Sequence, residues 1–91
     1  MPLFRRKPPP ATTGLPPDKQ IVRRLRELCQ AYARDDTALI RIHEPWATAL
    51  GKDLNYRGGI EEMRRIFQKV GSRPGARTLE MLWDGIGEWR G

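Results

Sequence analysis

The chain has 91 residues, of which 38% are hydrophobic and 31% are charged, enough for one small domain. No apolar run in the sequence approaches the roughly 20 residues that span a bilayer, and a single cysteine excludes a disulfide framework and a multi-thiolate zinc site. The 17 basic and 11 acidic residues give a net charge of +6. We therefore expect a cytoplasmic domain whose positive charge either attracts an anionic partner or only maintains solubility.

The positive charge is concentrated in the first third of the chain. Residues 1–34 contain eight basic and two acidic side chains, so they account for the whole net charge of +6. This polarity favours an anionic partner, and a largely non-specific contact with nucleic acid would need no more than such charge. The predicted contacts with an anionic partner are Arg5, Arg6, Lys7, Lys19, Arg23, Arg24 and Arg26.

Residues 1–17 are predicted to form a disordered, proline-rich basic tail. Six of the eight prolines lie in this segment, and proline both fixes φ and lacks the N–H that a helix interior requires. The three consecutive prolines at 8–10 favour an extended polyproline II conformation. We therefore expect the folded, helical domain to comprise residues 18–91.

The first predicted helix covers residues 18–34. Its apolar side chains recur at steps of three and four residues, which is typical of one buried helical face; they are Ile21, Val22, Leu25, Leu28, Cys29 and Tyr32. Pro17 and Asp18 suit the beginning of a helix, where a missing N–H and a negative charge are both tolerated. Asp35 and Asp36 are predicted to break this helix and to cap the next one.

The second predicted helix covers residues 37–56 and is expected to be kinked at Pro45, with Trp46 inside the core. Its apolar positions are Leu39, Ile42, Trp46, Ala49, Leu50 and Leu54. A short strand at residues 39–42 is the alternative, but a lone strand would have no partner in this chain. Arg57, Gly58 and Gly59 predict a turn after this helix.

A third helix is predicted over residues 60–70 and a fourth from about Ala76. The inward side chains are expected to be Ile60, Met63, Ile66, Phe67 and Val70 in the third helix, and Leu79, Leu82, Trp83 and Ile86 in the fourth. The fold class is therefore all-α, a small bundle of three or four helices. The segment around Gly58 also has the outline of a helix-turn-helix, but Glu61 and Glu62 at the start of its second helix would repel DNA.

The sequence contains no recognisable constellation of acid, base and nucleophile. His43, the only histidine, is interpreted as a structural or solvent-exposed residue rather than a general base or pH switch, and Cys29 as a small buried apolar residue. Gly58 and Gly59 precede a helix, as in phosphate-binding loops, but the surrounding motif is missing, so a turn is favoured. We predict no enzyme activity, no metal and no cofactor.

Trp89 follows two glycines near the end of the sequence and has two possible roles. It either folds back as a lid over the helices or anchors a protein partner, since tryptophan is enriched in interface hot spots. The sequence thus favours a non-enzymatic adaptor that acts through protein–protein contacts. The alternative is an electrostatic nucleic-acid or ribonucleoprotein binder that uses the tail and the first helix.

Overall fold

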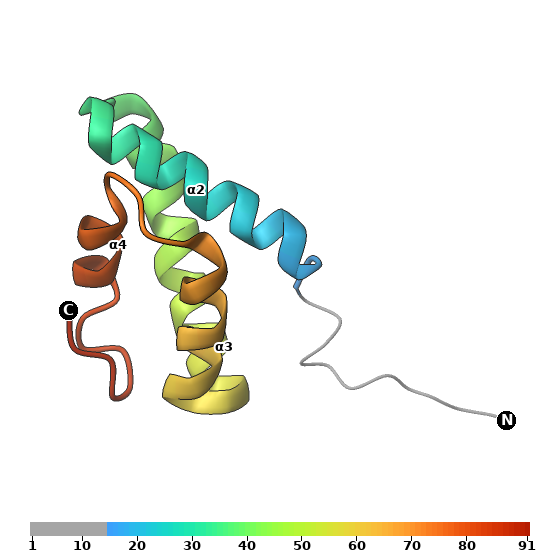
Figure 1. The fold of residues 1–91 in the computed structure, drawn as a ribbon. Coiled ribbons are helices and arrows are strands. Elements are labelled where there is room, and N and C mark those ends of the chain that lie inside the picture. The colour runs from blue at the N-terminus through green and yellow to red at the C-terminus, as the bar shows by residue number, and fades with distance from the viewer. Residues whose placement is uncertain (1–14) are drawn as a thin grey trace, which may run out of the picture.

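The computed structural model describes residues 15–91, so the predicted disorder of residues 1–14 lies outside the described residues. Within residues 15–91 the chain forms three helices and no strand. They are α2 (Asp18–Arg34), α3 (Thr37–Val70) and α4 (Ala76–Leu82), arranged as in Figure 1. The predicted all-α class is confirmed, and the alternative strand at residues 39–42 is wrong. None of the helices in this part of the chain is long and apolar enough to cross a membrane.

Helix α2 has the bounds that the sequence predicts. The carbonyl of Pro17 accepts hydrogen bonds from the N–H groups of the first helical turn, and Leu15 packs against the core. At the other end Asp35 adopts a left-handed conformation with φ of 59°, and the Asp36 carboxylate accepts the N–H of Leu39 at 3.2 Å. These two aspartates therefore end α2 and cap α3, as the sequence predicts. The buried side chains of α2 are Ile21, Val22, Leu25, Leu28, Cys29 and Ala31.

Helix α3 consists of two arms that join at Gly59. Gly59 has φ of 68° and ψ of −156°, a conformation that glycine adopts at little cost. Figure 1 shows the chain reversing direction at this point, so that residues 37–58 and 60–70 run antiparallel. The predicted turn is confirmed. The antiparallel arms of residues 37–70 differ from the steeply crossed helices of a helix-turn-helix.

The first arm of α3 buries only part of the face that the sequence predicts: Leu50 and Leu54 are buried as expected, but the other predicted positions are not. Leu39 is 38% exposed, Ile42 is 60% exposed, Ala49 is exposed, and Trp46 is only half-buried. The prediction that Trp46 lies inside the core is therefore wrong. The arm remains helical through Pro45, and its core side chains are Ala47, Leu50 and Leu54, with Gly51 buried beside them.

The physical reason for this rotation is the packing of Trp83, which lies just after α4. The Trp83 indole is fully buried, and its Nε1–H donates to the carbonyl of Ala47 at 2.9 Å. A Cβ atom at Gly51 would lie 2.8 Å from the same Nε1. Because the indole needs small residues beneath it, Ala47 and Gly51 face inward and the larger Ile42 is left at the surface.

An aromatic cluster closes the core at the C-terminal end of the chain. The rings of Trp83 and Trp89 meet edge to face with centroids 5.2 Å apart, and Phe67 lies 5.5 Å from Trp89. Trp89 is 5% exposed, and its Nε1–H donates to the carbonyl of Glu80 at 2.9 Å. Trp89 is thus the predicted lid. A partner anchor at Trp89 is not supported, because this side chain would first have to leave the core.

Candidate anion-binding groove

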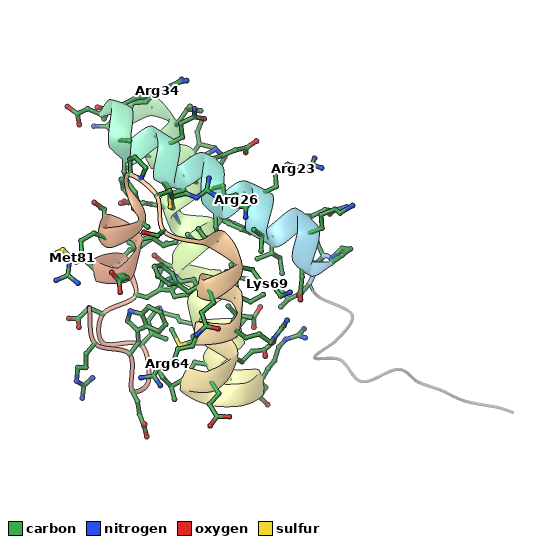
Figure 2. The ribbon with its side chains drawn as sticks, in the orientation of Figure 1. Arg23, Arg26, Arg34, Arg64, Lys69 and Met81 are labelled. Atoms are coloured by element: carbon green, nitrogen blue, oxygen red, sulfur yellow. The ribbon has the colours of Figure 1, made fainter. Side chains whose placement is uncertain are left out.

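An open groove of about 890 Å³ runs along the outer face of α2 and reaches the C-terminal end of α3. Six basic side chains line it against two acidic ones, Asp18 and Glu27. Figure 2 shows Arg23, Arg26 and Arg34 spaced along α2, with Lys69 on the neighbouring arm of α3. The six basic residues are Lys19, Arg23, Arg26, Arg34, Lys69 and Arg73.

The regular spacing of α2 explains why its basic residues gather in this groove. Residues at steps of three and four share one face of an α-helix, and most of the apolar stripe of α2 lies on the other side of the helix. The basic stripe comprises Lys19, Arg23, Arg26 and Arg34. Val22, Ala33 and Pro74 also line the groove, so it combines a charged rim with aliphatic surface.

Two arginines of the groove are held by the last carbonyls of α3. Arg26 donates from Nε to the Val70 oxygen at 3.2 Å and from Nη2 to the Lys69 oxygen at 2.8 Å. Arg73 donates from its own Nε to the same Val70 oxygen at 2.9 Å. Cations are stabilised at a helix C-terminus, where unpaired carbonyls carry a partial negative charge. The two guanidinium groups are therefore fixed beside each other at this end of the groove.

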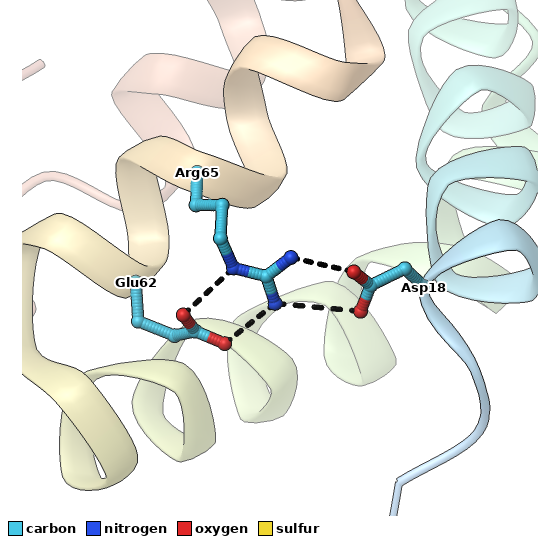
Figure 3. A network of polar contacts seen from close by, with 3 residues as sticks. All are labelled: Asp18, Glu62 and Arg65. Carbon is cyan, nitrogen blue, oxygen red and sulfur yellow. Dashed lines mark hydrogen bonds and ion pairs between the residues drawn. The ribbon is translucent and has the colours of Figure 1, made fainter.

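An ion-pair network fixes the other end of the groove. Arg65 donates from Nη1 to Asp18 at 2.5 Å, and from Nε and Nη2 to Glu62 at 2.9 and 2.7 Å (Figure 3). The hydrogen bond from Arg65 lowers the pKa of Asp18, and the same guanidinium lowers the pKa of Glu62. The network links the start of α2 to the second arm of α3. It also pairs the Asp18 carboxylate with a cation outside the groove, so Asp18 offsets less of the groove's positive charge.

Arg24 does not belong to the groove. Its Nε donates to His43 Nδ1 at 3.1 Å, and its guanidinium lies 4.3 Å from the centroid of the Trp46 ring. Beside this contact the Tyr32 hydroxyl donates to Glu44 at 2.6 Å, and burial together with this bond raises the pKa of Tyr32. These side chains join α2 to the first arm of α3, and His43 takes part as a hydrogen-bond acceptor.

The structure thus brings together three of the predicted contact residues, Lys19, Arg23 and Arg26. Arg5, Arg6 and Lys7 lie outside the described residues. Sequence reasoning missed Arg34, although it continues the basic spacing of α2. It also missed Lys69 and Arg73, for which no local signal exists, because they reach the groove only when α3 folds back against α2.

Residues 15–91 contain no group of three or more histidine, cysteine, aspartate or glutamate side chains that could hold a metal ion. Cys29 is fully buried, and burial raises the pKa of its thiol.

Comparisons of the chain with protein-family models, curated proteins and solved structures find no match.

Proposed function

We propose that this is a cytoplasmic, non-enzymatic adaptor that holds an acidic segment of another protein in the groove of α2. The observation that carries the proposal is the excess of six basic over two acidic side chains around one continuous groove. Such a charge distribution attracts a negatively charged partner and fixes its orientation. The groove combines the basic side chains of α2, which carries much of the chain's positive charge, with Lys69 and Arg73 from outside that helix.

The lining of the groove favours a protein segment over a nucleic acid. None of the described residues that line it is aromatic, so it offers no stacking surface for single-stranded bases. Its aliphatic residues, Val22, Ala33 and Pro74, suit the apolar side chains of a peptide. Glu27 would repel the regularly spaced phosphates of a nucleic-acid backbone that follows the groove, whereas a peptide can place a neutral side chain beside Glu27.

The length of α2 sets the length of the segment it can hold. Its 17 residues correspond to about 25 Å at the rise of an α-helix. An extended chain advances about 3.3 Å per residue, so a segment of about seven or eight residues would cover the groove. We expect acidic side chains at several of these positions and apolar side chains at others.

A binding measurement tests this proposal. The probe is a fluorescently labelled peptide of alternating glutamate and leucine, titrated with the full chain and followed by anisotropy. The double variant Lys19→Glu/Arg23→Glu should weaken binding by about tenfold or more, because it reverses two charges in the groove. The matched control is Arg41→Glu/Lys52→Glu, which changes the net charge equally at exposed positions of α3 outside the groove. It should change the affinity by less than about threefold.

Two other results would decide against the proposal. A single-stranded RNA that binds more tightly than the peptide, and that both double variants weaken equally, would favour the electrostatic nucleic-acid alternative. In that case replacing Arg5, Arg6 and Lys7 with alanine should flatten the salt dependence of binding. If neither probe binds at moderate ionic strength, the charge of the groove only maintains solubility.

A further inference from the structure

The end of the groove beside α3 has an unusual arrangement of like charges. One carbonyl oxygen, that of Val70, accepts from the Nε atoms of both Arg26 and Arg73. Two guanidinium groups therefore meet at one helix end, whose partial charge is about minus one half of an elementary charge. No carboxylate among residues 15–91 forms an ion pair with either arginine. Positive charge at this position exceeds what the chain itself neutralises.

The two guanidinium groups also retain unused hydrogen-bond donors. Each guanidinium has five N–H donors in a planar fork. Arg26 uses its Nε and one Nη atom on the carbonyls of Lys69 and Val70, whereas Arg73 uses only its Nε. Both Nη groups of Arg73 and one Nη group of Arg26 thus have no bond within the described chain, and both side chains line the groove. The carbonyls of α3 hold these side chains in place before any ligand arrives.

We propose that Arg26 and Arg73 form a subsite for a phosphate monoester, so that the acidic segment in the groove carries a phosphorylated side chain at this point. This inference rests on the proposed function of the groove. A phosphate monoester carries close to two negative charges at neutral pH and three strong acceptor oxygens. It can therefore bridge two guanidinium forks, whereas a single carboxylate saturates one fork. Clusters of arginine that converge in this way are a recurring means of recognising phosphorylated segments.

The test compares two labelled peptides of identical acidic sequence, one with a central phosphoserine and one with glutamate in its place. The full chain should bind the phosphoserine peptide about tenfold more tightly than the glutamate peptide. Arg73→Lys keeps the charge but removes the fork, so it should lower the affinity for the phosphoserine peptide to about that for the glutamate peptide. Arg41→Lys, at an exposed position of α3 outside the groove, is the matched control and should leave the preference intact. Thermal melts of both variants verify that they fold.

Each alternative outcome has its own meaning. Equal binding of the two peptides would overturn the subsite and leave the groove's function standing, whereas binding of neither peptide would remove the proposed function itself. A phosphoserine preference that survives in both Arg73→Lys and Arg26→Lys would also overturn the assignment. Inorganic phosphate serves as a competitor and should displace the phosphopeptide only weakly. If inorganic phosphate or an oligonucleotide competes as strongly as the phosphopeptide itself, the site does not select a phosphorylated protein segment.

Discussion

The replacement Trp83→Phe tests how the core of this small domain is built. Trp83 is fully buried, donates its indole N–H to the Ala47 carbonyl at 2.9 Å, and contacts both Phe67 and Trp89. Phenylalanine preserves an aromatic ring but loses this hydrogen bond and part of the packing. The substitution should therefore weaken the contact between α4 and the first arm of α3 without introducing a new polar group.

The expected loss of stability follows from these contacts. The smaller ring lacks about three of the buried heavy atoms, which is worth about 2 kcal/mol at ~0.8 kcal/mol per buried methylene. Loss of the hydrogen bond from the Trp83 indole to the Ala47 carbonyl adds about 1 kcal/mol to this cost, because the carbonyl itself keeps its position within α3. We thus expect Trp83→Phe to lower the free energy of unfolding by about 3 kcal/mol, a large share of the roughly 5–10 kcal/mol typical of a domain this size.

Urea unfolding followed by far-UV circular dichroism measures this loss, with an unchanged m-value as evidence that the comparison is valid. Trp46→Phe is the matched control, because Trp46 is half-buried and its indole donates no hydrogen bond within the described chain. We expect it to cost less than about 1 kcal/mol. Equal losses from the two substitutions would refute the assignment of the buried face of α3.

Three further predictions concern the backbone, the ion-pair network and the thiol. Gly75→Ala should destabilise the protein by more than about 4 kcal/mol in urea titrations, because its Cβ would lie 2.0 Å from the Cys29 carbonyl oxygen. Gly85→Ala, at a similar positive φ in open space, should cost only about 1 kcal/mol. Asp18→Asn should cost under about 1 kcal/mol at neutral pH, since the pair with Arg65 is exposed. The pKa of Asp18 is lowered from 3.8 in the folded protein, so the ion pair with Arg65 stabilises the wild type fully above pH 3.8. This stabilisation is lost as the pH falls through the lowered pKa. The thermal midpoints of the wild type and Asp18→Asn should therefore converge in acid. A thiol reagent should modify Cys29 only at the rate of global unfolding, and rapid labelling of the native protein would contradict its burial.

The candidate site could be predicted only in part. The positive charge of the first helix was evident from the sequence, and Lys19, Arg23 and Arg26 were named as contacts on that basis. Arg24 was named for the same reason, but it lies on another face of α2 and contacts Trp46. Charge alone does not specify the direction of a side chain, because direction depends on which helical face the core takes.

The sequence by itself determined where α2 ends and where α3 begins, reverses and ends, but not the end of α4, which stops at Leu82 although Trp83 and Ile86 were expected to continue it. Asp35 and Asp36 separate α2 from α3, Gly59 allows the chain to reverse between the arms of α3, and Gly71 ends the second arm with φ of 84°. Signals of this kind act through the backbone of a few neighbouring residues, so they can be interpreted without knowledge of the rest of the fold. For the same reason the apolar stripe of α2 was predicted well, since only one of its faces is apolar.

Only the tertiary structure decided which face of the first arm of α3 is buried and which residues complete the groove. This arm has apolar side chains around much of its circumference, so its own sequence does not select a face. The indole of Trp83 makes the selection by packing against Gly51 and Ala47, the small residues of the arm, which leaves Ile42 exposed. The return of α3 likewise places Arg73 beside Arg26, because both guanidinium groups bind the carbonyl at its end. Both outcomes depend on contacts between residues far apart in the chain, which local helix signals do not encode.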